Sequence, residues 1–200
     1  MTFWRTALVL VCLVILTASG CAKRVLVEPA VDTAVYKRIA ILPFTTEGSS
    51  SDIGTQLADE VTLNLLAQAP DVQIVERTKI NVLTLPDNLR NGARSKEEIA
   101  IALGQLLEVD AVLTGSVTLS LEYMSSEGWN RRIGYATAVV RLIAIRDGSV
   151  VWAKREEVEN LEARYTDNTS WRTDYEITQD VIRELAQKIA RNFYSHYERH

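Results

Sequence analysis

The chain has 200 residues, of which 47% are hydrophobic, and its 26 acidic and 22 basic side chains give a formal net charge of −4. A mildly acidic chain lacks the basic surface that nucleic-acid binding requires, so we expect no nucleic-acid partner. Without its N-terminal signal the chain keeps roughly 180 residues, enough for one domain with a proper hydrophobic core.

The N-terminus resembles a bacterial lipoprotein signal. A short basic start, Met1–Arg5, precedes the apolar run Thr6–Leu16, which is shorter than the roughly 20 apolar residues that span a bilayer. Small residues at 18–20 then lead to Cys21, as they do in a lipobox. We therefore expect a signal peptide over residues 1–20 and acylation of Cys21, with an uncleaved transmembrane start as the alternative.

Acyl chains such as palmitate on Cys21 would anchor the chain stably to a membrane. Ala22 follows, where lipoproteins kept at the inner membrane commonly have Asp, so the resemblance implies the periplasmic face of the outer membrane of a Gram-negative bacterium. Residues 21–36 show no sustained hydrophobic period and predict the lipidated cysteine and a tether. Residues 37–197 are expected to form a single periplasmic domain without a disulfide.

The first half of this domain predicts alternating strands and helices. Arg38–Phe44 is a continuous apolar run, typical of a strand buried on both faces. Apolar residues at helical spacing between positions 53 and 66 predict a helix, and Val72–Val75 predicts the next strand. A short helix over Thr78–Leu83 and a helix that begins with the capping-box pattern Ser95–Glu98 follow.

The second half predicts an antiparallel meander and a closing helix. Alternating apolar and polar residues indicate strands with one solvent-exposed face, and Asp147–Gly148 predicts a tight two-residue turn. An apolar stripe from Ile177 to Tyr194 predicts the closing helix. The fold class is therefore α/β (α+β), a mixed sheet with an antiparallel meander flanked by amphipathic helices. The predicted strands are 110–121, 134–145 and 150–158, and the predicted turn or loop regions are 125–132 and 160–174.

Several segments occur in the order RIAILPF at 38–44, VER at 75–77, DAVLTG at 110–115, and Gly148 with Trp152. In this order they resemble CsgG-like and LpoB-like lipoproteins, which are similar to the N-terminal domain of TolB. The resemblance covers roughly Tyr36–Tyr194. It implies a non-enzymatic binding or assembly factor in cell-envelope biogenesis.

Two alternatives remain open, a subunit of a CsgG-like secretion pore and an LpoB-like activator of a peptidoglycan synthase. In the pore, hairpins from several copies would join into one transmembrane barrel. The charged residues within 121–135 and 160–174 disfavour this, because a charged side chain that faces lipid costs free energy. The short tether disfavours the activator, which must reach through the cell wall.

No phosphate-binding loop, nucleophile motif or metal-ligand spacing occurs in the sequence, so we expect neither an enzyme nor a cofactor. The expected partner is a periplasmic or envelope protein, with a second copy of the chain as an alternative. Glu76 and Arg77 follow a buried strand, where either a ligand site or a simple hydrogen-bonded strand end is expected. Aromatic and arginine side chains in polar loops are typical of protein contacts. The candidate partner-binding residues are Trp129, Trp171, Arg131, Arg132 and Arg172.

Overall fold

The computed structural model describes residues 24–46, 51–75, 95–126, 129–161 and 173–199. The chain forms two compact units, a body over Pro29–Tyr194 and a small unit from the two ends of the chain. The described part of the small unit is the antiparallel pair β1 (Arg24–Val27) and β8 (His196–Arg199).

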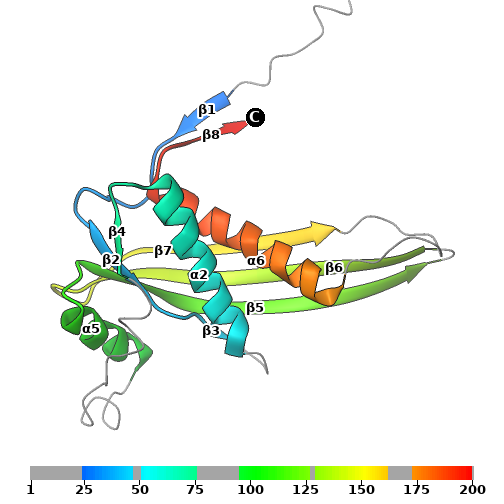
Figure 1. Ribbon diagram of the computed structural model, residues 1–200, viewed down its shortest axis with the longest axis horizontal. Helices are drawn as coiled ribbons and strands as arrows, with labels where there is room; N and C mark the ends of the chain where they lie inside the picture. Colours follow the sequence, from blue (N-terminus) through cyan, green and yellow to red (C-terminus); the bar gives the residue numbers. More distant parts are fainter. Residues whose placement is uncertain (1–23, 47–50, 76–94, 127–128, 162–172, 200) are drawn as a thin grey trace, which may run out of the picture. The chain divides into compact units, whose positions relative to one another are not determined.

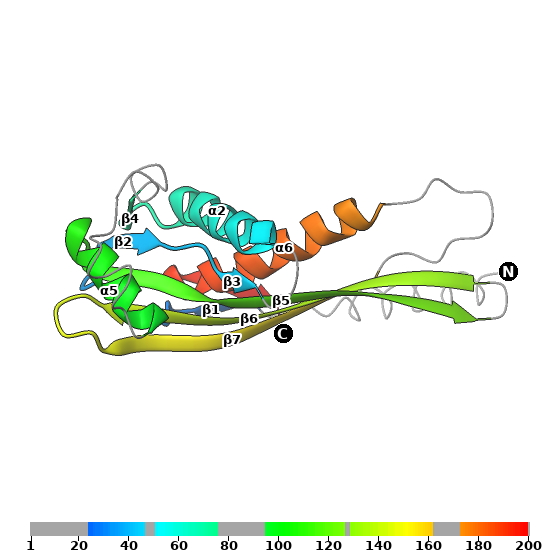
Figure 2. The same cartoon turned by 90° about the horizontal axis from the view of Figure 1, so that it is seen from below.

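The body contains one mixed sheet in the order β4-β2-β5-β6-β7 (Figures 1 and 2). The three strands at one side are parallel, and β5, β6 and β7 form the predicted antiparallel meander. A short strand, β3, also pairs with β5. The strands of the body are β2 (Arg38–Ile41), β3 (Thr45–Thr46), β4 (Gln73–Val75), β5 (Ala111–Ser126), β6 (Trp129–Ala144) and β7 (Val150–Leu161).

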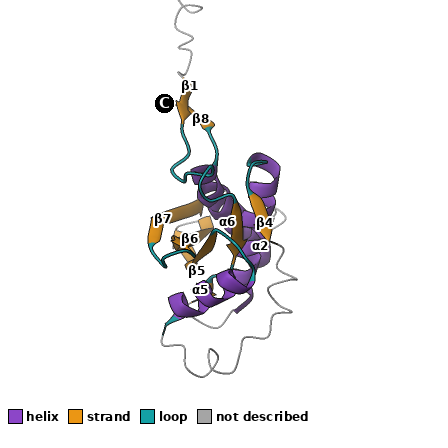
Figure 3. Ribbon diagram, turned by 90° about the vertical axis from the view of Figure 1, so that its left-hand side faces the viewer, coloured by secondary structure: helices purple, strands orange, loops and turns teal. Residues whose placement is uncertain are grey.

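Helices cover both faces of this sheet. α2 (Ser51–Gln68) and α6 (Asp174–Ala190) pack on one face, and α5 (Lys96–Leu106) packs on the other (Figure 3). The sequence of β2 is a continuous apolar run because both faces of this strand are buried. Ile39 belongs to the core under α2 and α6, and Ala40 belongs to the core under α5. The predicted fold class is confirmed.

Both well-defined helix starts follow from local chemistry. The Ser95 hydroxyl accepts a hydrogen bond from the Glu98 amide at 3.2 Å, which confirms the predicted start of α5. At α6 the Thr173 hydroxyl and the Glu176 carboxylate each accept a hydrogen bond from the other residue's backbone amide, a complete capping box. A short 3-10 helix, Arg191–Phe193, continues α6.

The segment predicted as a turn region at 125–132 is mostly strand. β5 and β6 stay paired out to Ser126 and Trp129, whereas the described part of β7 pairs no further along β6 than Ile133. Figure 2 shows that β5 and β6 continue past the start of α6. The prediction was wrong because a two-stranded ribbon needs no buried face, so its polar sequence lacks the alternation of a packed strand.

Other elements differ from the predictions at their ends. The connection between β6 and β7 contains five residues, 145–149, instead of a two-residue turn, although Gly148 does have the positive φ of 71° that favours glycine. Part of the predicted loop after position 44 is strand β3. The predicted helix over Thr78–Leu83 lies outside the described residues.

Two strands lie where the sequence predicts none. β1 occupies part of the predicted tether, and β8 occupies the end of the chain where the pattern indicated only a helix terminus. Val31, also within the predicted tether, is 2% exposed, and its amide donates to the Asn192 carbonyl at 2.9 Å. These segments are ordered because each pairs with a partner more than 150 residues away, which local patterns do not reveal.

Candidate functional site at the end of the β5–β6 ribbon

The far end of the β5–β6 pair is a two-stranded segment that we call the ribbon end, defined as residues 122–126 and 129–133. Cross-strand pairs place Tyr123 opposite Arg132, and Met124 opposite Arg131. Trp129 is the first residue of β6, opposite Ser126. Three of the predicted contact residues therefore lie on one short stretch of strand instead of in a loop.

Tyr123, Arg132 and Asp174 form a polar cluster where the ribbon end meets the first residue of α6. The Tyr123 hydroxyl donates to Asp174 Oδ2 at 2.6 Å, and Arg132 Nη1 lies 3.0 Å from Asp174 Oδ1. The guanidinium carbon of Arg132 also lies 5.2 Å from the centre of the Tyr123 ring, within cation–π range. Tyr123 and Arg132 are a cross-strand pair of β5 and β6, and both contact Asp174. The cluster thus connects both strands of the ribbon end to the start of α6.

These contacts orient side chains more than they stabilise the fold. Tyr123 is 62% exposed, and exposed ion pairs contribute only about 0–1 kcal/mol. The hydrogen bond to Asp174 raises the pKa of Tyr123, so the phenol keeps its proton at neutral pH. The cluster therefore presents an aromatic and a cationic side chain in a defined arrangement at the surface.

A separate pocket of about 490 Å³ lies between α5 and the sheet. Glu97 and Arg141 form a 2.9 Å ion pair at this pocket. The pKa of Glu97 is lowered, first by a hydrogen bond with its own backbone and then by a hydrogen bond from Ser95 and the charge of Arg141, although burial acts to raise it. The described lining residues include hydroxyl groups but no His or Cys. The described residues that line the pocket are Leu42, Pro43, Thr45, Lys96, Glu97, Ile99, Leu103, Thr114, Gly115, Ser116, Val139 and Arg141.

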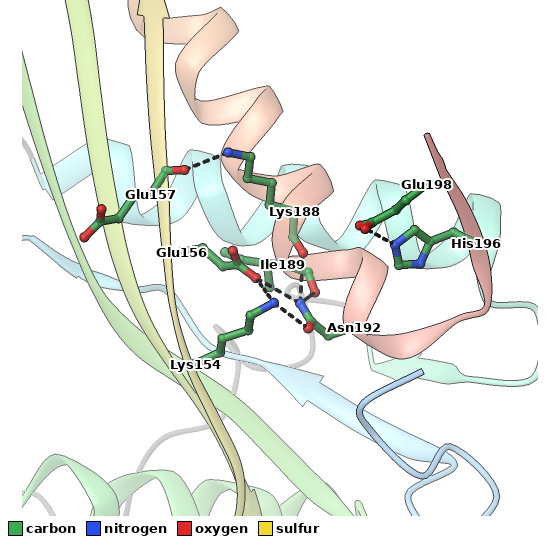
Figure 4. Close-up of polar contacts among 8 residues, drawn as sticks. All are labelled: Lys154, Glu156, Glu157, Lys188, Ile189, Asn192, His196 and Glu198. Atoms are coloured by element: carbon green, nitrogen blue, oxygen red, sulfur yellow. Dashed lines mark hydrogen bonds and ion pairs between the residues drawn. The ribbon is translucent and has the colours of Figure 1, made fainter. Parts of the chain in front are cut away.

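A second polar cluster closes the C-terminal end of α6 (Figure 4). The side-chain amide of Asn192, which is only 7% exposed, donates to the carbonyls of Lys188 and Ile189 at 2.9 and 3.0 Å. It also donates to Glu156 at 3.2 Å, and its oxygen accepts from Lys154 at 3.1 Å. Every polar atom of the Asn192 side chain is thus used to hold the helix end against β7, which is a structural role.

Within the described ranges, no group of three or more His, Cys, Asp or Glu residues could hold a metal ion. Among the helices of the described part of the chain, none is both long and apolar enough to cross a membrane. The ribbon end and the α5 pocket are candidate places for contact with another molecule among the described residues.

The structure brings together only some of the predicted site residues. Arg132 is placed in the Tyr123–Asp174 cluster, and the backbones of Trp129 and Arg131 are placed on β6 beside it. Sequence reasoning missed Tyr123 and Asp174, although a hairpin centred on 127–128 would have set Tyr123 opposite Arg132. The predicted residues outside the described ranges are Cys21, Glu76, Arg77, Trp171 and Arg172.

The sequence matches no family model and no curated protein. Among solved structures, the chain is similar to the PelC dodecamer from Paraburkholderia phytofirmans, with 15% identity, coverage of 85% of this chain and 94% of that chain, and a TM-score of 0.47. It is similar to a minor lipoprotein from Acinetobacter baumannii, with 18% identity, coverage of 78% and 91%, and a TM-score of 0.41. It is also similar to the LpoB C-terminal domain from Salmonella enterica, with 14% identity, coverage of 72% and 89%, and a TM-score of 0.39. Similarity at this level identifies neither a family nor a function.

Proposed function

We propose that this protein is a lipid-anchored outer-membrane lipoprotein that acts without catalysis, as a binding or assembly factor in the cell envelope. It faces the periplasm and contacts an envelope protein through the ribbon end. The lipobox-like residues before Cys21 support the anchor and the location. The resemblance to CsgG-like lipoproteins and to the TolB N-terminal domain stays a prediction.

The ribbon end is the observation that carries the binding role. Its two strands extend beyond the last described pair with β7, and Tyr123 and Arg132 are held there by Asp174. Aromatic and arginine side chains dominate the energetics of protein interfaces because they bury a large area. Trp129 and Arg131 add two more side chains of these kinds to the same stretch of sequence. Trp171 and Arg172 stay predicted contact residues.

The reach of the proposed anchor limits how far the start of the body lies from the membrane. Seven residues, 22–28, lie between Cys21 and Pro29, where the body begins, and the eight steps from one to the other span at most about 29 Å. Strand β1 occupies four of these residues, so a fully extended connection would require its pairing with β8 to break. The proposed anchor therefore keeps the start of the body, Pro29, close to the membrane that holds the acyl chains.

The anchor is tested by fractionating cells and measuring the intact mass of the protein. The mature chain should begin at Cys21 with acyl chains attached, and Cys21→Ala should move the protein from the membrane to the soluble fraction. A wild-type chain that retains residues 1–20 contradicts the anchor.

The contact surface is tested with Trp129→Ala and Trp171→Ala. We first identify the partner by photo-crosslinking from position 129 in cells, and then titrate the purified partner. Each substitution should weaken binding roughly thirtyfold, corresponding to the loss of about 2 kcal/mol for one interface anchor. Each should change the free energy of unfolding by less than about 0.5 kcal/mol, as is usual for surface positions.

Leu63→Ala is the matched control, because Leu63 is an exposed apolar residue on α2. It should leave both binding and stability unchanged. A Trp129→Ala variant that binds the partner as well as wild type contradicts the proposed contact surface. A variant that loses several kcal/mol of stability shows that its tryptophan is a core residue.

A further inference from the structure

The small unit contains a two-stranded antiparallel ribbon whose two faces differ. The register pairs Leu26 with Tyr197 and Val25 with Glu198. Because directly paired residues of antiparallel strands share a face and successive residues alternate, Arg24, Leu26 and Tyr197 lie on one face. Val25 and Glu198 lie on the other. We call the first the Leu26 face.

The Leu26 face is apolar, aromatic and cationic, and its side chains are exposed. Leu26 is 48% exposed and Tyr197 is 69% exposed, and the side chain of Arg24 is exposed beside them. The opposite face contains Val25 and Val27 together with the polar contact between His196 Nε2 and Glu198 Oε1, which are 3.2 Å apart. An arginine beside an aliphatic and a tyrosine side chain is the combination that lies well at a lipid surface, where the tips reach headgroups and the stems contact acyl chains.

The ribbon begins close to the cysteine that we propose is acylated. Arg24 follows Cys21 by three residues, so even a fully extended chain separates them by about 11 Å at most. A ribbon tied this closely to embedded acyl chains remains at the headgroup level. An isolated two-stranded ribbon is at best marginally stable in water, and it gains stability by placing one face on another surface.

We propose that the β1–β8 ribbon is a membrane-surface contact whose Leu26 face lies on the lipid headgroups. The partner is a lipid surface with anionic headgroups, which attract Arg24. This inference depends on acylation of Cys21, which is part of the proposed function. It adds that the chain docks on the membrane through a folded element instead of hanging from it on a flexible tether.

The test compares two adjacent positions of the acylated mature protein, which begins at Cys21, in the variants Leu26→Cys and Val25→Cys. Each introduced cysteine carries an environment-sensitive fluorophore, and the protein is reconstituted in vesicles of phosphatidylethanolamine and phosphatidylglycerol. The label at position 26 should be quenched by brominated lipid and should be quenched several-fold less by aqueous iodide than the label at position 25. The matched control is position 25, which lies on the opposite face of the same strand.

A charge variant tests the role of the headgroups. Arg24→Glu, added to Leu26→Cys, should raise iodide quenching of the label in vesicles that contain phosphatidylglycerol. The same variant should have a smaller effect in vesicles of phosphatidylcholine alone, because these carry no net negative charge to repel the glutamate.

Intact mass and labelling stoichiometry separate the possible failures. An unacylated Cys21 takes up a second label and lacks the acyl mass, which contradicts the anchor itself. Correct acylation together with equal iodide quenching at positions 25 and 26 overturns the membrane contact alone. If the label at position 26 is protected from iodide but is not quenched by brominated lipid, it contacts protein, and this result also overturns the proposed membrane contact.

Discussion

Gly54 gives a prediction in which two physical effects have opposite signs. It lies in the first part of α2, where the helix meets the backbone after β2. A Cβ atom at this position would lie 1.8 Å from the Phe44 carbonyl oxygen and 2.8 Å from its carbon. The Phe44 amide also donates to the Gly54 carbonyl at 3.1 Å, so the two backbones are held together at this point. Even the shortest separation that real Cβ atoms show, 3.0 Å, would require one of the two backbones to move by about 1.2 Å.

Alanine is favoured over glycine within a helix by about 1 kcal/mol, so helix propensity alone predicts that Gly54→Ala stabilises the protein. Overpacking against a rigid neighbour costs about 1–3 kcal/mol, and the loss of the hydrogen bond from Phe44 costs about 1 kcal/mol more. The net expectation is a decrease of about 1–3 kcal/mol in the free energy of unfolding. Urea denaturation followed by circular dichroism measures it.

Gly104→Ala on α5 is the control for this reasoning. A Cβ atom there would meet the end of the Ile145 side chain at 2.3 Å and Val112 Cγ2 at 2.8 Å. Side-chain ends can change rotamer, whereas the Phe44 backbone cannot, so this variant should lose less stability than Gly54→Ala. A Gly54→Ala protein at least as stable as wild type would refute the close approach of the two backbones.

Two further predictions concern polar contacts within the body. Hydrogen bonds from the Ser149 side chain and backbone lower the pKa of Asp147 from 3.8 to about 2, so its carboxylate stabilises the fold above pH 3.8 and this contribution disappears as the pH falls through about 2. Asp147→Asn should therefore unfold more easily than wild type at neutral pH and converge with it in acid, and identical urea midpoints at neutral pH would contradict this. Asn192→Ala leaves the carbonyls of Lys188 and Ile189 without their side-chain donor, so the free energy of unfolding should fall by about 1–3 kcal/mol in the same assay. An unchanged midpoint would show that Asn192 does not close α6.

The sequence was sufficient to predict those strands and helices whose buried faces impose a regular pattern of apolar residues. The apolar run at 38–44 predicted a strand covered on both faces, and Ile39 and Ala40 do face different cores. The stripe that begins at Ile177 predicted the face of α6 that is buried in the structure. In each case the pattern reflects contact with the core, which is the strongest constraint that packing places on a sequence.

The same reasoning failed where strands have no core to face. The ribbon end has two strands, and the β1–β8 pair has only four residues in each strand, so neither shows a sustained period. The pairing of Arg24 with Arg199 also joins positions 175 residues apart, which no local pattern can report. The contact residues at the ribbon end were predicted from their chemistry, but their arrangement depends on a register that the sequence did not reveal.

Helix α6 extends from the ribbon end to the residues at which the body continues into the small unit. Its first residue, Asp174, contacts Tyr123 and Arg132 at the ribbon end. Its last turn is closed by Asn192, whose carbonyl accepts from the Val31 amide, so both connections to the small unit leave the body near this end. A helix of 17 residues is about 25 Å long. The proposed contact surface and the residues at which the body continues into the small unit therefore lie at opposite ends of α6.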